Sequence, residues 1–321
     1  MENGRKKFKF EILLSRYFTN FHRIVLTNLL FAVPSAVFFA AFWFLSNALF
    51  KGTVAAVILL SIIPLFPFYA GVVMVCRNIA RGDTDVKVVS EFFFAIKDNF
   101  RHFLVHGLVV YVITTLSVLA ISLYVSMLSS GWFFYALLFF CIIVVVFLAY
   151  TVFYLPLMSV TYDLPLRYIY KNSFLMSFGE FKNNFFATLA LAVVFAICFT
   201  VTMFAHTQTA LIIMLAVMWA VLIPATCTFM IVFFIYDGMT NIIRDKEELS
   251  RELTESIDKQ MAERQKELNP VQEQEDFSDI DISALKDTDD YIFHNGRMVK
   301  QSTLLRMIKE REQSSEGDKD E

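Results

Sequence analysis

Six long apolar runs dominate the hydrophobic pattern of this chain, and none of them contains an Asp, Glu, Lys or Arg. About 20 apolar residues in a helix cross the hydrocarbon core of a bilayer, and each run reaches that length. The pattern therefore predicts an all-α polytopic membrane protein with six transmembrane helices. The predicted spans are 24–50, 53–76, 103–128, 132–154, 185–205 and 210–236.

A short polar-aromatic step recurs before the first, third and fifth runs. It reads Asn20-Phe21, Asn99-Phe100 and Asn184-Phe185. Two spans separate successive copies, so each copy opens a helix of the same orientation. We therefore expect three helical hairpins in parallel orientation rather than inverted repeats. Each returning helix also carries proline in its second half or just past its end, at Pro64 and Pro67, Pro156, and Pro224.

Two of the polar connections between spans have an amphipathic pattern. In 88–102 the apolar residues recur at helical spacing, and charged residues lie largely away from them. Segment 164–184 looks similar. The predicted apolar faces are Val89, Phe92, Phe93, Ile96 and Phe100 in one segment and Ile169, Phe174, Phe178 and Phe181 in the other. The pattern predicts interfacial amphipathic helices at the headgroup level, with a bend at each Asn-Phe step.

Charge divides the chain into a basic membrane part and an acidic tail. Residues 1–243 hold 15 Lys and Arg against 9 Asp and Glu, whereas residues 244–321 hold 13 against 22. We expect a basic N-terminal segment over 1–23, a membrane domain over 24–236 and a tail over 237–321. Within the tail we expect a charged helix over about 239–268 and a disordered stretch over 269–290. Asn295-Gly296 between short apolar runs predicts a hairpin, and with a short helix it fills 291–311.

The distribution of basic residues predicts the orientation in the membrane. The N-terminal segment and the connections after the second and fourth runs hold 14 Lys and Arg, and the other three connections hold only Lys51. Basic residues concentrate in short cytoplasmic loops, so both termini and the tail are predicted to be cytoplasmic in a multi-pass protein of the cell membrane. The first run is too long for a cleavable signal peptide and is expected to stay as a signal anchor.

Candidate chemistry is sparse. The chain has no GxSxG, HExxH, P-loop or GxGxxG pattern, and its four cysteines form no CxxC. His102 and His106 share a helix face but lack further ligands at helical spacing, so a hydrogen-bonded structural role is favoured over a metal site. Asn28 and Asn47 fit packing between helices, with a polar lining for a solute as the alternative. We predict no catalytic, cofactor-binding or metal-binding residues, no cofactor and no nucleic-acid partner.

Three sequence segments resemble one family. They are Asn28–Pro34 (NLLFAVP), Ala80–Asp83 (ARGD) with Phe92–Arg101 (FFFAIKDNFR), and Lys171–Leu175 (KNSFL). These segments resemble motifs of the YesL-like family of bacterial membrane proteins, over roughly residues 15–240. A Thr-Ile-Gly-Pro step of that family is absent here, and the acidic tail is longer. The resemblance implies an integral membrane protein associated with carbohydrate uptake, and it implies no catalytic residue.

Three functional hypotheses follow. The favoured one is an accessory or regulatory protein that binds a membrane protein partner, such as a transporter subunit, through its cytoplasmic loops and tail. The second is a transporter or channel for a neutral small solute, because spans without carboxylates do not fit proton coupling. The third, an enzyme, is disfavoured: its only acidic cluster, Asp83, Asp85, Glu91 and Asp98, is interleaved with Arg81 and Lys87 and fits a solvated surface.

Overall fold

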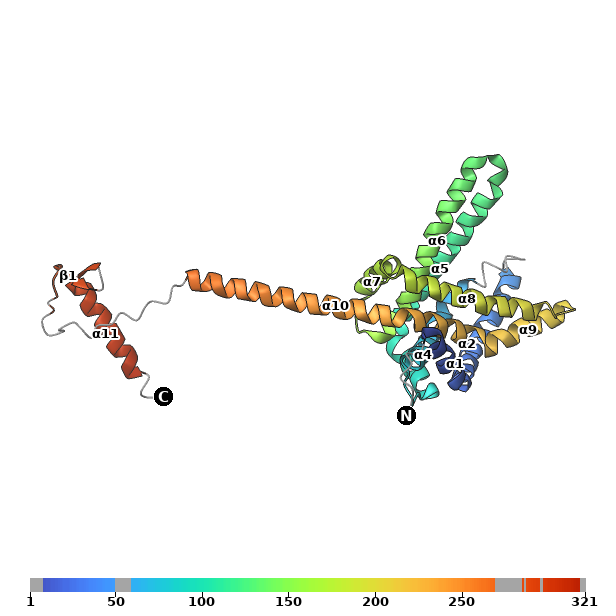
Figure 1. Cartoon of the computed structure of the whole chain (residues 1–321), viewed down its shortest axis with the longest axis horizontal. Coiled ribbons are helices and arrows are strands. Elements are labelled where there is room, and N and C mark those ends of the chain that lie inside the picture. Colours follow the sequence, from blue (N-terminus) through green and yellow to red (C-terminus); the bar gives the residue numbers. More distant parts are fainter. Residues whose placement is uncertain (1–7, 50–58, 269–284, 286, 295–296, 318–321) are drawn as a thin grey trace. The chain divides into compact units, whose positions relative to one another are not determined.

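The computed structural model describes residues 8–49, 59–268, 285, 287–294 and 297–317, and it divides into two compact units. The first unit, Met1–Asp245, is helical throughout its described part (Figure 1). Its helices are α1 (Lys9–Thr19), α2 (Phe21–Leu49), α4 (Ile62–Arg81), α5 (Val88–Ser126), η1 (Leu128–Ser130), α6 (Trp132–Thr161), α7 (Leu166–Gly179), α8 (Phe181–Thr202), α9 (Gln208–Val221) and the first part of α10 (Ile223–Leu268).

Six helices of the described chain are long and apolar enough to cross a membrane. They are α2, α4, α5, α6, α8 and α10. This confirms the predicted all-α polytopic character. The seventh apolar helix, α9, has 14 residues. At 1.5 Å per residue it is about 21 Å long, which is shorter than the roughly 30 Å hydrocarbon core.

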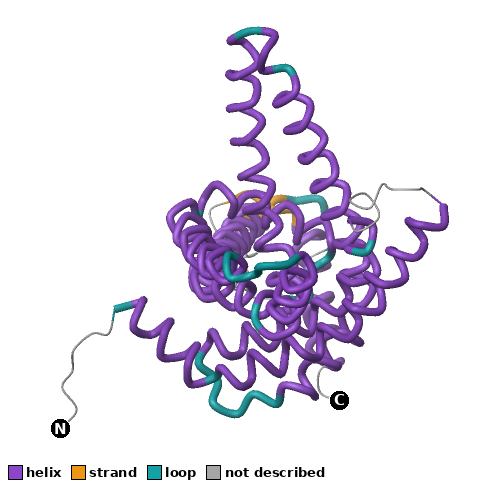
Figure 2. Tube along the Cα trace, turned by 90° about the vertical axis from the view of Figure 1, so that its right-hand side faces the viewer, coloured by secondary structure: helices purple, strands orange, loops and turns teal. Residues whose placement is uncertain are grey.

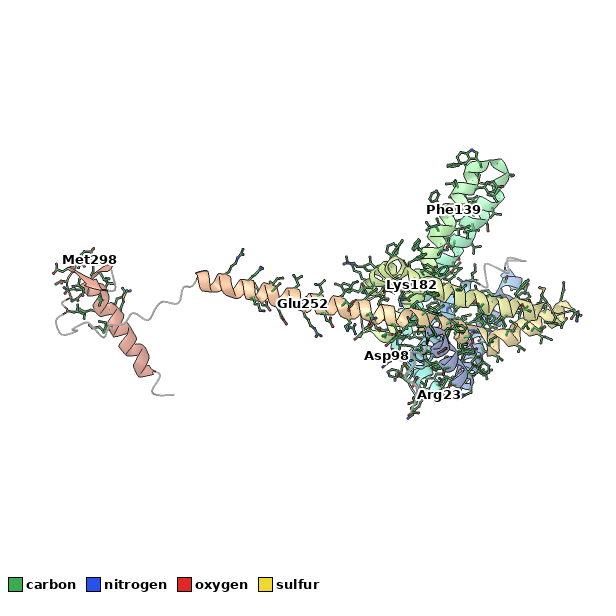
Figure 3. All side chains as sticks on the ribbon, in the orientation of Figure 1. Arg23, Asp98, Phe139, Lys182, Glu252 and Met298 are labelled. Atoms are coloured by element: carbon green, nitrogen blue, oxygen red, sulfur yellow. The ribbon has the colours of Figure 1, made fainter. Side chains whose placement is uncertain are left out.

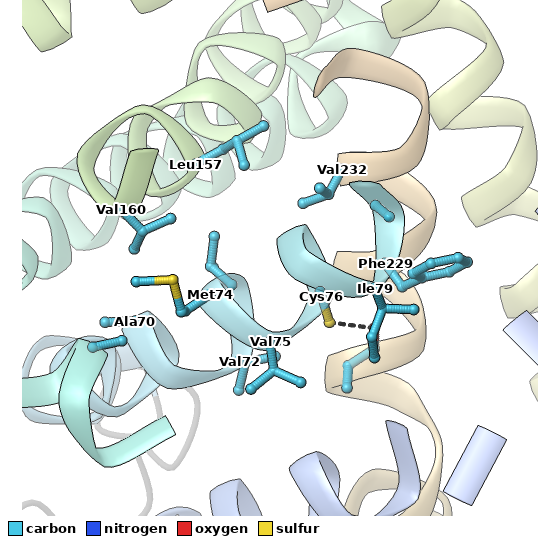
Figure 4. Packing of buried hydrophobic residues seen from close by; sticks show 14 of the residues in the cluster. Ala70, Val72, Met74, Val75, Cys76, Ile79, Leu157, Val160, Phe229 and Val232 are labelled. Carbon is cyan, nitrogen blue, oxygen red and sulfur yellow. Dashed lines mark hydrogen bonds between the residues drawn. The ribbon is translucent and has the colours of Figure 1, made fainter. Parts of the chain in front are cut away.

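The core of the first unit surrounds α4, which is the most buried of the candidate spans. The apolar side chains from Ala70 to Cys76, together with Ile79, are buried and meet Leu157 of α6 and Phe229 of α10 (Figure 4). Glycine permits the close approach of α5 to α4. A Cβ on Gly107 of α5 would lie 2.9 Å from the Ile63 carbonyl oxygen of α4, too near for any other residue without a shift.

The structure corrects the expected bend at Asn99-Phe100. Helix α5 runs unbroken from Val88 to Ser126, so the predicted interfacial segment and the third span form one helix. No proline or glycine interrupts residues 88–106, and nothing in this stretch forces a break. Breaks do occur near the other two steps, at Asn20 between α1 and α2 and at Glu180 between α7 and α8.

The sixth span also differs from expectation. Instead of one helix over 210–236, the chain forms α9 and then α10, with Leu222 between them. Pro224 has no N–H and clashes with the carbonyl four residues earlier, so a continuous helix is unfavourable here. The predicted start of the second span, 53–58, lies outside the described residues.

The predicted apolar face of 88–102 is divided in the structure. Phe92 is buried with Ala95 and Phe103, whereas Phe93 and Phe100 are exposed. In α7 the division is similar: Ile169 is buried, and Phe174 and Phe178 are exposed and lie close to each other. Both segments therefore have one face that packs into the core and a second, exposed aromatic face, on which Phe178 stacks against Phe147 of α6.

The outer halves of α5 and α6 form a hairpin that projects from the other helices of the first unit (Figures 1 and 2). Its side chains are apolar and exposed, including Leu119, Phe139 (Figure 3) and Phe140. Trp132, at the start of α6, is 81% exposed. An apolar surface on all sides with tryptophan at the end is typical of a lipid-exposed hairpin whose tip reaches the membrane interface.

The second unit, Lys246–Glu321, contains the rest of α10, the strands β1 (Tyr291–His294) and β2 (Arg297–Lys300), and α11 (Gln301–Gly317). The strands are antiparallel, with Ile292 opposite Val299. Leu304 and Ile308 of α11 are buried. The N–H groups of Gln301 and Ser302 donate to the carbonyls of Asp290 and Thr288. These elements cover 291–294, 297–300 and 301–317, and a hairpin with a short helix was expected over 291–311. The expected disordered stretch and Asn295-Gly296 lie outside the described residues.

Candidate functional site

The most concentrated polar structure inside the apolar helices is the break between α9 and α10. A helix end leaves backbone carbonyl and N–H groups without helical partners, and burying them unpaired is unfavourable. Asn28 of α2 satisfies groups on both sides of the break. Its Nδ2 donates to the carbonyls of Val221 (2.9 Å) and Leu222 (3.2 Å), and its Oδ1 accepts from the N–H of Ala225 (2.7 Å).

Hydroxyl groups extend this cluster along the first turns of α10. Tyr17 of α1 lies 3.1 Å from the Thr226 hydroxyl, and Tyr69 of α4 lies 2.8 Å from the Thr228 hydroxyl. The Cys76 thiol donates to the Ala225 carbonyl (dashed in Figure 4). Burial raises the pKa of Tyr17, and its hydrogen bond to Thr226 offsets part of that rise. The start of α10 is thereby connected to α1, α2 and α4.

A second polar cluster contains the histidine selected from the sequence. His106 is fully buried, its Nδ1 lies 2.8 Å from the Tyr170 hydroxyl of α7, and its Nε2 lies 2.7 Å from the Ser159 hydroxyl of α6. Burial raises the pKa of Tyr170 to about 12, so this hydroxyl stays protonated near neutral pH. The contacts with Tyr170 and Ser159 thus occupy both ring nitrogens of His106.

The asparagines of the repeated step also bond to helix ends. Asn184 donates to the carbonyls of Met176 (3.3 Å) and Ser177 (3.1 Å) in the last turn of α7, and it accepts from the Tyr154 hydroxyl (2.8 Å). Asn20 donates to the Arg16 carbonyl of α1. Asn99 donates to Ala95 within the unbroken α5. Two of the three copies thus complete a preceding helix.

Three arginines counted as basic loop residues donate to backbone carbonyls, two near the ends of returning helices and one in the connection after α4. Arg16 donates to the Ala80 carbonyl near the end of α4, and Arg77 donates to the Val160 carbonyl near the end of α6. Arg23 donates to the Thr84 carbonyl at 2.9 Å. Cations stabilise helix C-termini, where carbonyl groups point outward. These residues therefore support the fold as well as the charge asymmetry.

The acidic residues of the second connection do not converge. Asp83 pairs weakly with Arg81 at 4.0 Å on an exposed surface, and Glu91 accepts from Asn78 (2.7 Å) and from the N–H of Lys87 (3.0 Å). Across the described residues no three His, Cys, Asp or Glu side chains gather in a way that could hold a metal ion. The four cysteines are free thiols.

The polar groups that the sequence singled out inside the spans are thus bonded to other helices or to their own. Among the described residues, Asn47 bonds to the Trp43 carbonyl of its own helix. Sequence reasoning missed the hydroxyls of Tyr17, Tyr69 and Thr226. A signal for them existed in the run Pro224-Ala225-Thr226-Cys227-Thr228, where hydroxyls follow a proline inside an apolar segment.

Comparison with known families gives one match. The family described as "Protein of unknown function, DUF624" matches residues 24–121, which cover most of α2, all of α4 and most of α5. No curated protein and no solved structure matches the chain. The match supports a relation to a family without an assigned activity. It covers Asn28, and its matched range ends before α9 and α10, where the partners of Asn28 lie.

Proposed function

We propose that this protein is an accessory or regulatory protein of the cell membrane that binds a second membrane protein, such as a subunit of a transport or signalling system. The observation that supports a binding role over a solute path is the bonding of Asn28. Its amide is fully buried and uses both ends on the backbone around Leu222. A polar side chain held in this way serves packing and is not free to exchange partners with a passing solute.

In this proposal both termini lie in the cytoplasm and the spans form three hairpins. The bias of 14 basic residues against one supports the orientation. The bonds that Asn20 and Asn184 make to the ends of preceding helices support the equivalence of the first and third helical hairpins. The carbohydrate-uptake setting rests on the YesL-like resemblance alone.

The distal part of α10 has the properties of a docking helix. Leu249, Leu253, Ile257 and Met261 recur every four residues and are each 46–65% exposed. The neighbouring positions Ser250, Thr254, Ser256 and Gln260 are uncharged, so the stripe lies on a broad uncharged face. Charged residues in this segment would prevent it from lying within the hydrocarbon core, so the stripe must meet protein, headgroups or water.

The charges beside this face favour one kind of partner. With 100° between successive residues, Glu252 and Lys259 lie on one flank of the stripe, and Asp258 and Arg251 lie on the other. Each flank therefore carries both signs of charge. The complementary surface is an apolar groove or helix with charges of both signs along its rims, on the cytoplasmic part of a membrane protein.

A neutral-solute transporter remains the second candidate, and the α9–α10 break favours it. Interrupted membrane helices form the binding sites of many transporters. The two proposals differ in a direct measurement, because a transporter reconstituted alone in lipid vesicles moves its solute. Uptake of a neutral sugar by vesicles containing only this protein would replace the accessory proposal.

The accessory proposal is tested by photo-crosslinking in native cells. A photoreactive amino acid is placed at Leu253, with a matched control at Phe139, which is equally exposed (60% and 61%) but lies on the α5–α6 hairpin. We expect one defined membrane-protein adduct from position 253, its loss in Leu249→Asp, and its retention in Glu255→Gln. Removal of the chain after Leu268 separates the roles of α10 and the β1–β2–α11 element. Equal adducts from both positions would contradict the proposal.

A further inference from the structure

Helices α4, α6 and α10 line a partly open cavity of about 210 Å³ in the first unit. Its wall includes Phe66, Tyr69, Phe153, Pro156, Thr228 and Val232. Figure 4 shows the neighbouring packing, with Leu157 and Val232 directed toward each other from α6 and α10. Asn28 does not line this cavity, and neither do the exposed surfaces described above, but its Tyr69–Thr228 contact belongs to the hydroxyl cluster at the start of α10.

The polar groups of the wall have a defined hydrogen-bond direction. The Thr228 hydroxyl donates to the Pro224 carbonyl (2.7 Å) and has no further hydrogen to give. The Tyr69 hydroxyl, 2.8 Å from the Thr228 oxygen, must therefore be the donor in that contact. Its own oxygen keeps its acceptor capacity.

These directions exclude several kinds of occupant. The lining carries no charged residue to neutralise an ion. A hydrocarbon or acyl chain has no hydrogen-bond donor and would leave the Tyr69 hydroxyl oxygen without a donor. A water molecule usually needs three hydrogen bonds in a buried site, and a largely apolar wall supplies few partners. The remaining class has an apolar body and one hydrogen-bond donor.

We propose that this cavity binds a small neutral alcohol or phenol, with its hydroxyl donating to the Tyr69 oxygen and its body against Phe66, Phe153 and Val232. A water-sized group takes up about 30 Å³, so the cavity volume of about 210 Å³ holds about seven non-hydrogen atoms. Hexanol and phenol have this size. The site is independent of the partner-binding proposal, since its wall lies outside the distal part of α10.

Full-length protein in lipid nanodiscs is photolabelled with a diazirine derivative of a six-carbon alcohol, and labelled residues are identified by mass spectrometry. The competitors are 1-hexanol and its isomer butyl ethyl ether, which matches it in composition but has no donor. We expect saturable labelling of α4, α6 or α10 residues around the cavity. Hexanol should protect about tenfold better than the ether, as one net hydrogen bond provides.

Three variants separate the site from general effects. Tyr69→Phe removes the acceptor and should abolish the difference between hexanol and ether. Val232→Phe fills the cavity and should abolish saturable labelling even if Tyr69→Phe does not fold. Tyr17→Phe removes a comparable hydroxyl contact away from the cavity and should leave labelling unchanged. Equal protection by hexanol and the ether would show that the cavity accepts apolar chains without using a hydrogen bond, and it would overturn the proposal. Labelling confined to lipid-facing residues such as Phe139 would also overturn it.

Discussion

The bonding of Asn28 gives a quantitative prediction for the stability of the membrane domain. Asn28→Ala removes two donors from the carbonyls of Val221 and Leu222 and one acceptor from the N–H of Ala225. The Leu222 carbonyl keeps a contact with the N–H of Thr226 at 3.3 Å. The substitution therefore leaves the Val221 carbonyl and the Ala225 N–H as the groups most deprived of partners.

The expected magnitude follows from measured bonds between membrane helices, which average about 0.6 kcal/mol and reach about 1.7 kcal/mol. Three such bonds contribute about 2 to 5 kcal/mol. The remaining Thr226 contact to Leu222 lowers the estimate toward its smaller end. We expect Asn28→Ala to reduce the free energy of unfolding by about 2–3 kcal/mol, which is large for one polar substitution.

The measurement is reversible unfolding in mixed micelles, followed by tryptophan fluorescence, with Asn47→Ala as the matched control. Asn47 lies in the same helix, and among the described residues it bonds to its own Trp43 carbonyl, so its loss should change the unfolding free energy by less than about 0.5 kcal/mol. Pro224→Ala restores an N–H at the break and should reduce the effect of Asn28→Ala in a double-mutant cycle. Equal effects of the two asparagine substitutions would refute the bridging role.

Three further predictions use the same structure. Gly107→Ala should destabilise the first unit by about 1–3 kcal/mol because its Cβ would approach the Ile63 carbonyl, whereas Gly179→Ala, with no atom within 4 Å of its Cβ, should be neutral in the same unfolding assay. His106→Leu should destabilise by a similar amount because it leaves the Tyr170 and Ser159 hydroxyls unpaired, and Tyr170→Phe should be milder; equal effects would contradict the double contact. In cysteine-accessibility labelling, a probe at Ser130 should react from outside the cell and one at Asp83 only after permeabilisation, and the reverse pattern would refute the orientation.

The sequence was sufficient for the features that depend on local pattern. Runs of apolar residues locate most of the candidate spans, because length and the absence of charge determine where a helix can cross lipid. Apolar runs on both sides of Asn295-Gly296 correspond to β1 and β2, since antiparallel pairing of strands that are close in sequence is local. The α9–α10 break is different, because Pro34, Pro67 and Pro156 lie inside unbroken helices and Pro224 alone therefore does not predict a break.

Features that depend on distant partners were beyond the sequence. From the sequence alone, Asn28 could serve helix packing or line a path for a solute. Its bond to the distant Val221 carbonyl is what distinguishes the two roles. The predicted face of 88–102 treated Phe92 and Phe93 alike, yet only Phe92 meets Gly71 of α4. Which aromatic residue enters the core is decided by the neighbouring helix, and a period of 3.6 residues does not carry that information.

The bond between Asn28 and Ala225 also has a consequence for the order of biosynthesis. The two residues are 197 positions apart, and they lie in the first and the last of the candidate spans. At about 5–20 residues per second, a ribosome needs about 10–40 s to make the intervening chain. During that time α2 resides in the membrane with an amide that lacks its final partners. Completion of the bundle therefore waits for the last helix, and a chain interrupted before α9 exposes an unsatisfied asparagine that membrane quality control could recognise.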